Sequence, residues 1–401
     1  MKGYKAFEKG MICREKQYAE NTVFEEESAE ICKSGMHFCK NPLDVLEYYP
    51  LVDESGNVTE FAEVEALDAV KTDDNKKYCT KKLKIGAKID FARLVQASVG
   101  FEYKKGVDIE STSDDYAKIG SSGNSAQIGS SGDYAQIGSS GNYAKIGSSG
   151  DYAKIGSSGD YAKIGSSGYY AQIGSSGNYA KIGSSGCSAQ IGSSGCSAQI
   201  GSSGDFAKIG SSGDFAKIGS SGDSAKIGSS GCSAQIGSSG CSAQIGSSGD
   251  FAKIGSSGDF AKIGSSGDSA KIGSSGCSAQ IGSSGDSAKI GSSGDFAKIG
   301  SSGDYAQIGS SGNSAKIGSS GNSAKIASKG KYSVVCCAGP DSMVKAKKGS
   351  WITLSEWEYD EKEKANIPTC VKTVQVDGET IKEDTFYKLV NGEFKEVSAN
   401  E

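Results

Sequence analysis

Three residues that could do chemistry lie close together near the N-terminus, in the stretch from Cys32 through His37 to Cys39, which holds the only histidine of the chain. With Cys13, they offer sulfur and nitrogen donors that zinc accepts, but the spacing Cys-x4-His-x-Cys is not one of the usual zinc patterns. A cysteine nucleophile would also need an acid to orient the imidazole, and none is identifiable. We therefore favour a buried strand with a hydrogen-bonded histidine, and we expect no metal, no cofactor and no catalytic residue here.

A column of aromatic residues in the middle of the chain is the second candidate. The six tyrosines that recur at nine-residue intervals are Tyr134, Tyr143, Tyr152, Tyr161, Tyr170 and Tyr179. If successive units alternate between two faces, each face gains three stacked rings flanked by Lys or Gln. Such rings would suit a protein or carbohydrate partner. The alternative is that the stacked rings only stabilise the sheet.

These tyrosines belong to a nine-residue unit that repeats 24 times between Asp115 and Ile326. Between successive isoleucines the chain reads Gly-Ser-Ser-Gly, then Asp, Asn or Cys, then Tyr, Phe or Ser, then Ala, then Lys or Gln, and only Tyr169 departs from the Asp, Asn or Cys class. A strict short period is typical of a solenoid, in which each unit buries its apolar face against the next. Residues 183–227 and 228–272 are identical, which indicates duplication and a variable number of units.

Each unit predicts a short strand followed by a tight turn. In Tyr152–Ile155, Ala153 and Ile155 would share the inner face of a strand, and Tyr152 and Lys154 the outer face. Gly-Ser-Ser-Gly disfavours helix, and its glycines permit a sharp corner. Two units per coil are favoured, because an interior of only Ala and Ile suits closely spaced sheets. Three units per coil are the alternative.

Three known binding chemistries do not fit this unit. The calcium-binding nonapeptide needs a second Gly where this chain has Ser, and its Asp and apolar positions are each displaced by one. Ice binding would need a regular hydroxyl array, but the repeat lacks Thr and carries Lys and bulky rings. A phosphate-binding loop would end in Lys-Ser or Lys-Thr before a helix, and Gly-Ser-Ser-Gly does not.

Charge and cysteine use limit the partners and the compartment. The repeat carries 15 Lys against 13 Asp, and the whole chain has a net charge of −5, so a nucleic-acid partner is not expected. The repeat cysteines are never 18 or 27 residues apart, so stacked coils would not pair them, and free thiols in a reducing cytoplasm are expected. The sequence has no apolar run long enough for a membrane span and no signal peptide. We expect a protein of a bacterial cytoplasm or a virion.

The flanking segments predict two further domains. Residues 1–110 indicate a small α+β domain with strands at Tyr4–Phe7, Thr22–Glu25 and Glu60–Ala66. A helix would start at Asn41 with Pro42 in its first turn, and a second would span Phe91–Ser98. The solenoid would occupy residues 111–326.

Residues 327–401 predict degenerate capping coils and a β-hairpin tail. Val335 and Val344 continue the nine-residue spacing of the isoleucines. The segment from Trp351 to Trp357 alternates like a strand. Asp377-Gly378 and Asn391-Gly392 are hairpin signals between apolar segments. Terminal units that differ from the rest would protect the exposed edge of the last coil.

A resemblance covers both flanks. The pattern Cys-x-Ser-Gly-Met-His-Phe-Cys-x-Asn-Pro-Leu-Asp-Val-Leu-x-Tyr-Tyr at residues 32–49 resembles a domain family of unknown function found in phage and gut-bacterial proteins. The resemblance implies the same plan: an N-terminal domain, a short-period repeat and a tail with a Gly-Ser-Trp segment, here Gly349 to Trp351. It implies no activity. Gly35-x-His37 followed by a helix with Tyr also resembles ADP-ribosyltransferase-like folds, but no catalytic glutamate can be assigned.

The sequence therefore predicts a mainly β protein: a nonapeptide-repeat β-solenoid with an α+β head and a β cap. We expect a non-enzymatic structural or binding protein, a spacer or display rod whose aromatic and Lys ladders contact a partner. One alternative is that the head binds or modifies a nucleotide-like ligand and the solenoid is only a scaffold. Another is a filament protein that self-assembles or associates end to end.

Overall fold

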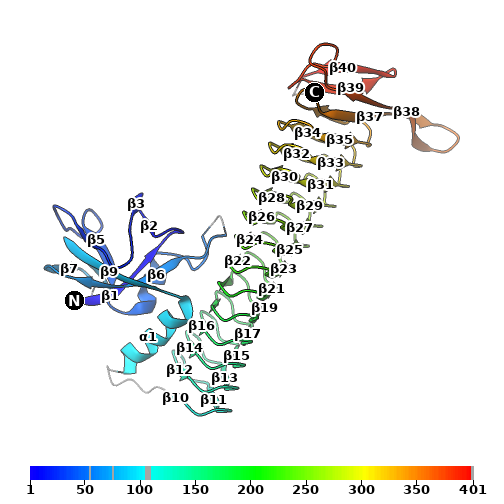
Figure 1. Ribbon diagram of the computed structural model, residues 1–401. Coiled ribbons are helices and arrows are strands. Elements are labelled where there is room, and N and C mark those ends of the chain that lie inside the picture. The colour runs from blue at the N-terminus through cyan, green and yellow to red at the C-terminus, as the bar shows by residue number, and fades with distance from the viewer. Residues whose placement is uncertain (54–55, 75, 104–109, 399–401) are drawn as a thin grey trace. The chain divides into compact units, whose positions relative to one another are not determined.

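A computed structural model describes residues 1–53, 56–74, 76–103 and 110–398 (Figure 1). The chain is mainly β, with 47% strand and 4% helix. A small N-terminal domain is followed in the sequence by a parallel β-solenoid of about 14 turns, formed by residues 111–354. The chain divides into two compact units, Met1–Ala225 and Lys226–Glu401. Among the described helices, none is both long and apolar enough to cross a bilayer.

The 24 repeat strands run from β11 (Lys118–Ser121) to β34 (Lys325–Ser328) and each spans Lys or Gln, Ile, Gly and Ser, except that Ala replaces Gly in the last. In β15 (Lys154–Ser157), Ile155 pairs in parallel with Ile173, 18 residues later. Two units therefore make one coil, as expected, and the alternative of three is wrong. Even-numbered strands form one sheet and odd-numbered strands form the other.

The position of the strand within the unit differs from the prediction. Tyr152 does not lie on a strand face but at the corner before it, with a left-handed φ of 56°. The strand starts at Lys154 and includes Gly156 and Ser157, which were predicted to turn. The reason is that Ser157 is buried with Ile155, so the true alternation is Lys out, Ile in, Gly out, Ser in.

Two interactions between coils hold the corner before β15, and both recur at many other corners. The backbone N–H of Tyr152 donates to the carbonyl of Tyr169 at 2.8 Å. The Asp133 carboxylate accepts from the backbone N–H of Asp151 at 2.8 Å, and Asp or Asn repeats this contact along much of the solenoid. The Asp/Asn position is thus structural, because its side chain satisfies a main-chain donor of the next coil.

The head is built on a seven-stranded sheet in the order β4-β9-β6-β1-β5-β8-β7. Its strands are β1 (Lys2–Phe7), β4 (Val23–Glu25), β5 (Met36–Cys39), β6 (Glu60–Ala66), β7 (Val70–Thr72), β8 (Lys77–Thr80) and β9 (Lys82–Ile89). A two-stranded ribbon, β2 (Ile12–Cys13) with β3 (Lys16–Gln17), stands beside it. The three predicted strands match β1, β4 and β6 to within two residues at each end.

The two predicted head helices are present, with differences. The first is a 3-10 helix, η1 (Pro42–Glu47), and the Asn41 side chain does not cap its backbone. Instead, the Asn41 amide donates to the Asp44 carboxylate at 3.0 Å. The second, α1 (Phe91–Tyr103), is longer than predicted. Phe91, Leu94 and Val95 pack with η1 in one of two apolar clusters of the head.

The head also packs against the even-numbered sheet of the first unit, which the sequence did not indicate. A β-carbon added to Gly183, in β18 (Lys181–Ser184), would overlap the ring of Phe91. Two polar contacts accompany the packing: the Lys181 ammonium donates to the Leu46 carbonyl at 3.0 Å, and the Leu51 N–H donates to the Gln199 side chain at 2.9 Å. Glycine at the outward strand position gives α1 a flat surface on which to lie.

The second unit ends in the cap. Its strands after the repeat are β35 (Val334–Cys337), β36 (Met343–Lys345), β37 (Trp351–Asp360), β38 (Ala365–Gln375), β39 (Phe386–Val390) and β40 (Glu393–Val397). Val335 and Val344 are fully buried, as the spacing predicted. β38 pairs antiparallel with β37, and β39 with β36, so the cap ends both parallel sheets.

Of the two predicted hairpins in the tail, one is confirmed and one is wrong. Asn391 and Gly392 connect β39 and β40, both with positive φ. Asp377-Gly378 joins no strand pair, because residues 380–381 form no strand and β38 pairs with β37 instead. The Asp377 carboxylate accepts from the backbone N–H groups of Glu379 and Ile381, which stabilises an open turn.

Candidate functional site

The predicted tyrosines form two separate ladders in the first unit. The first ladder comprises Tyr116, Tyr134, Tyr152 and Tyr170, and the second comprises Tyr143, Tyr161 and Tyr179. Neighbouring ring centroids lie 4.9–5.0 Å apart with planes within 10° of each other. The sequence predicted two faces with three rings each, but it did not include Tyr116, which is separated from Tyr134 by the Ser125 unit.

The ladder side chains are exposed on strained backbone. All seven tyrosines have φ near 60°, and their exposed fractions lie between 43% and 68%. Left-handed φ costs a non-glycine residue roughly 1–2 kcal/mol, and glycine would avoid this cost. Stacking returns about 0.5–1.5 kcal/mol for each pair of rings. The fold alone therefore gives little reason to place tyrosine at this corner.

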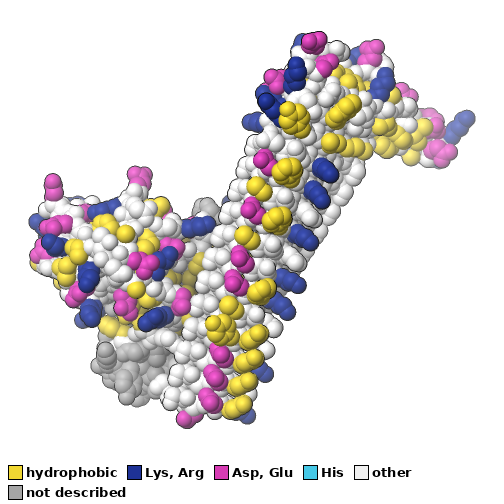
Figure 2. All heavy atoms as spheres, viewed as in Figure 1, with side chains coloured by type: hydrophobic (Ala, Val, Ile, Leu, Met, Phe, Trp, Pro, Cys, Tyr) yellow, Lys and Arg dark blue, Asp and Glu magenta, His cyan; other side chains and the backbone are white. Residues whose placement is uncertain are grey.

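The stack determines which part of each ring a partner can contact. Faces inside a ladder cover one another, so the outward surface is a row of ring edges and hydroxyls with a spacing of about 5 Å. Burial against neighbouring rings, followed by the nearby Tyr152 and Tyr116, raises the pKa of Tyr134. The Tyr134 hydroxyl therefore remains a neutral hydrogen-bonding group at physiological pH. Figure 2 shows hydrophobic side chains gathered along the solenoid.

The Tyr ladders end after Tyr170 and Tyr179, where Ser188 and Ser197 occupy the next positions. Further along, Phe206 and Phe215 are each 62% exposed, and the ring stacks recorded in the described solenoid involve tyrosines only. Their φ values are also about 57°. These phenylalanines therefore carry the backbone cost without a stacked ring to offset it.

The lysine column of the first unit is exposed on one sheet only. On the odd-numbered sheet, Lys154 is open to solvent. On the even-numbered sheet, Lys145, Lys163 and Lys181 are partly covered by the head. Burial, helped by the charges of Lys181 and Lys145, lowers the pKa of Lys163 to about 8. The predicted exposed lysine ladder is therefore wrong for the even-numbered sheet of this unit, because α1 and η1 lie over it.

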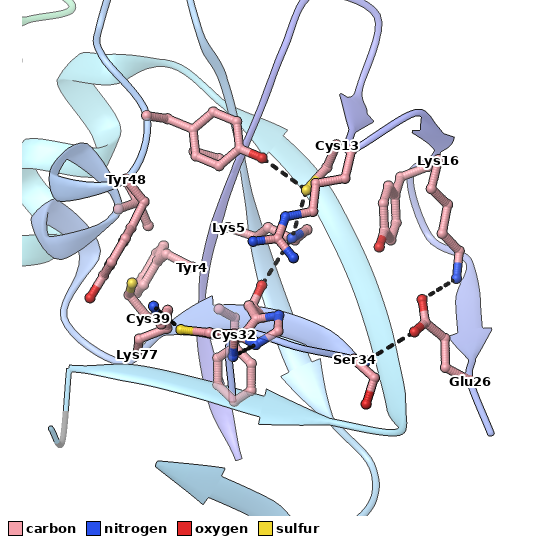
Figure 3. Close-up of a pocket in the computed structure, with 18 of the residues that line it drawn as sticks. Tyr4, Lys5, Cys13, Lys16, Glu26, Cys32, Ser34, Cys39, Tyr48 and Lys77 are labelled. Carbon is pink, nitrogen blue, oxygen red and sulfur yellow. Dashed lines mark hydrogen bonds and ion pairs between the residues drawn. The ribbon is translucent and has the colours of Figure 1, made fainter. Parts of the chain in front are cut away.

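A pocket of about 280 Å³ opens in the head and contains the other predicted residues (Figure 3). Its lining includes Cys32, His37 and Cys39, and also Cys13 from the β2–β3 ribbon. The strand β5 positions His37 and Cys39, and the preceding turn positions Cys32. The structure thus places these residues around one cavity.

The hydrogen bonds and burial of these residues do not give a metal-ligand set. Among the described residues, no three His, Cys, Asp or Glu side chains are arranged to hold a metal ion. The His37 Nε2 accepts from the backbone N–H of Cys32 at 3.1 Å, which requires that nitrogen to be unprotonated. Burial and the charges of Lys5, Arg14 and Lys77 lower the pKa of His37. Burial also raises the pKa of Cys39 to about 12, so its thiol stays protonated.

The basic residues of the pocket, Lys5 and Arg14 among them, were not identified from the sequence. Lys5 is only 5% exposed, and Arg14 lies on the turn between β2 and β3. The sequence placed Lys5 inside a predicted strand, between Tyr4 and Ala6. Period-2 alternation alone does not say that both faces of β1 are covered, so a buried lysine there could not be predicted.

The comparisons with known proteins add one finding for the head. Residues 1–97 match a family model described as a domain of unknown function (DUF7666). Neither the comparison with curated proteins nor the one with solved structures gave a match to this chain. The head is therefore similar to an uncharacterised family, and no relative supplies a function for either part.

Proposed function

We propose that this chain is a non-enzymatic binding scaffold whose solenoid displays the two Tyr ladders to a protein partner. The observation that carries the proposal is the regular stack of exposed rings at a corner position that other units fill with serine at the same φ. Seven tyrosines hold left-handed φ while leaving 43–68% of their surface open. Because the corner imposes this φ on the serine and phenylalanine units as well, the strain belongs to the fold, and the exposed aromatic surface is what distinguishes the tyrosines.

A protein partner fits the ladders better than a carbohydrate. Sugars stack on the flat faces of aromatic rings, whereas the faces of Tyr134, Tyr152 and Tyr161 are covered by neighbouring rings at 4.9–5.0 Å. The available surface is apolar at the ring edges and offers hydroxyls at a spacing close to the 4.7–4.9 Å between β-strands. Protein interfaces are also enriched in tyrosine.

End-to-end filament assembly is less well supported. Association through the C-terminal end would need an unpaired strand edge on the last coil. There, β36 and β37 are covered by antiparallel β39 and β38, so the two sheets end in the antiparallel strands β40 and β38 and not in a solenoid coil. We therefore keep the display role as the proposal.

The test compares full-length variants in which ladder tyrosines become serine, a residue that eleven units already carry at this position. One variant replaces Tyr134, Tyr143, Tyr152, Tyr161, Tyr170 and Tyr179. The matched control replaces Phe206, Phe215, Phe251, Phe260 and Phe296. Quantitative affinity capture from host lysate, followed by titration of each purified captured protein, measures the effect.

The proposal expects a captured protein that binds the wild type and the phenylalanine control with similar affinity. Its affinity for the tyrosine variant should fall at least tenfold. If every captured protein binds all three forms equally, the ladders are not the binding surface. A concentration-dependent mass increase of the wild type alone, measured by sedimentation, would make a second copy of this chain the partner.

A further inference from the structure

The head pocket contains a buried cation without a carboxylate partner. The Lys5 ammonium donates to the His37 carbonyl at 2.9 Å and contacts the Cys13 sulfur at 3.3 Å. It also lies over the rings of Phe7 and Tyr18, at 5.5 and 5.4 Å from their centroids. Across the described part of the chain, no carboxylate pairs with it. Burying a charge without a counterion is costly, and burial lowers the pKa of Lys5. A bound anion would favour the protonated ammonium, so the site is suited to one.

A second cation lines the same cavity on a strained turn. Arg14 and Glu15 connect β2 to β3 with φ values of 49° and 64°, and Met11 just before them has φ 58°. A two-residue hairpin with both φ values positive normally uses Asn or Gly. Within the described residues, the Arg14 guanidinium makes no hydrogen bond and no ion pair. No contact of the Arg14 side chain with the described residues therefore offsets the conformational cost of its positive φ.

The nearby acidic side chain does not neutralise this pair. Glu26 lines the pocket, but its carboxylate is 2.7 Å from the Lys16 ammonium and also accepts from the Gly35 N–H at 3.1 Å. Lys77 adds further positive charge at the rim, over the ring of Tyr48 at 4.5 Å. The cavity is therefore electropositive, and a guanidinium is well suited to hold a carboxylate or phosphate through two hydrogen bonds.

The remaining walls are aromatic. Tyr48, Tyr49 and Phe38 line the pocket, and the Tyr49 hydroxyl lies 2.9 Å from the Cys13 sulfur. Figure 3 shows Lys5 beside Cys13, with Tyr48 on the other side of the pocket. Pockets with apolar walls and a few converging polar groups bind small organic ligands. A volume of about 280 Å³ corresponds to a compact molecule.

We propose that the head pocket binds a small aromatic anion, with its carboxylate or phosphate held between Lys5 and Arg14 and its ring against the aromatic walls. This site is separate from the Tyr ladders and would give the head a small-molecule ligand of its own. The anion would supply the counter-charge that Lys5 lacks.

The experiment is calorimetric titration of the full-length chain with three probes: benzoate, phenyl phosphate and the neutral benzyl alcohol. Both anions, or one of them, should bind, and benzyl alcohol should bind at least tenfold more weakly. Which anion binds more tightly distinguishes a carboxylate site from a phosphate site. Equal binding of the neutral probe, or no binding of either anion, overturns the proposal.

Variants locate the site. Arg14→Gln should weaken anion binding at least tenfold, whereas Lys9→Gln, which removes an exposed lysine outside this pocket, should leave it unchanged. Lys5→Met should also abolish binding, and it should raise the melting temperature in anion-free buffer because it removes an uncompensated charge. A lower melting temperature for Lys5→Met would mean that Lys5 is structural. Unchanged affinity in Arg14→Gln would place the anion elsewhere.

Discussion

The ring of Phe91 lies directly against the backbone of Gly183, so closely that a β-carbon on this glycine would overlap it. Phe91 opens helix α1 of the head, and Gly183 is the outward glycine of a solenoid strand. This contact joins the N-terminal domain to the repeat within the first unit. Gly165 likewise lies against Val95 and Ala92 of α1, whereas the corresponding glycines of the odd-numbered sheet have no such contact.

We predict that Gly183→Val weakens the packing of the head on the solenoid. Overpacking of this kind costs about 1–3 kcal/mol, and here Phe91 and α1 would have to move. Hydrogen exchange of residues 91–98 should become faster, and limited proteolysis should cut the head earlier.

Gly192→Val is the matched control. Gly192 occupies the same position in β19 (Gln190–Ser193), the next strand along the chain, which belongs to the odd-numbered sheet. No heavy atom lies within 4 Å of its added β-carbon. This substitution should leave the exchange of residues 91–98 unchanged. Equal effects of the two substitutions would show that valine harms the strand itself and that the head contact is unimportant.

Replacement of Tyr152 by serine should lower stability through the loss of ring stacking. Tyr152 stacks with Tyr134 at 4.9 Å and with Tyr170 at 5.0 Å, so two pairs are lost at about 0.5–1.5 kcal/mol each. Chemical denaturation followed by near-UV circular dichroism measures the change. Phe206→Ser serves as the control, since its neighbours one coil away are Ser188 and Ser224, and it should change stability by much less. A similar loss in both variants would contradict a stacking contribution.

The last glycine of a Gly-Ser-Ser-Gly that stacks on a preceding coil should be irreplaceable, unlike the first glycine on the odd-numbered sheet. A β-carbon on Gly159 would overlap the carbonyl of Gly141 in the preceding coil. Gly159→Ala should therefore force neighbouring coils apart and cost several kcal/mol, as a severe steric conflict in a packed interior does. Gly156→Ala has open space around its β-carbon and should be tolerated. Thermal melts of the two single variants decide this, and equal melting temperatures would refute the steric explanation.

Stability of the first unit should rise with pH between about 8 and 10.5. Burial and neighbouring lysines lower the pKa of Lys163 from 10.5 to about 8 in the folded chain. In this range the unfolded chain holds the Lys163 proton and the folded chain does not, so raising the pH favours folding. The gain should be about 1–2 kcal/mol, since the side chain keeps some contact with solvent.

Lys163→Met isolates this contribution from the other groups that titrate in the same range. The difference in melting temperature between the variant and the wild type should be largest at pH 7 and should shrink toward pH 10.5. A difference that does not depend on pH would mean that Lys163 titrates normally in the folded state.

The sequence by itself determined the solenoid and the burial of its Ala and Ile columns, and it favoured two units per coil over three, which the pairing of Ile155 with Ile173 then decided. A strict nine-residue period leaves few ways to align isoleucines, and an interior of small side chains requires thin coils. Val335 and Val344 were predictable for the same reason. The position of Tyr152 was not, because Tyr-Ala-Lys-Ile and Lys-Ile-Gly-Ser alternate equally well. The choice between these two strands depends on contacts between coils. One example is the close approach of Gly159 to the carbonyl of Gly141, which sequence periodicity does not reveal.

Only the tertiary structure decided what the head contacts and what its pocket contains. Phe91 and Gly183 are far apart in the chain, and the outward glycines of the solenoid all look alike in sequence, so local pattern could not select one. The proposed role of Lys5 and Arg14 likewise depends on the tertiary structure. Packing of β1, β5 and the β2–β3 ribbon buries Lys5 and leaves neither cation paired with a carboxylate among the described residues. Periodic sequence fixes contacts between successive coils, whereas contacts between distant segments arise from the packed surfaces themselves.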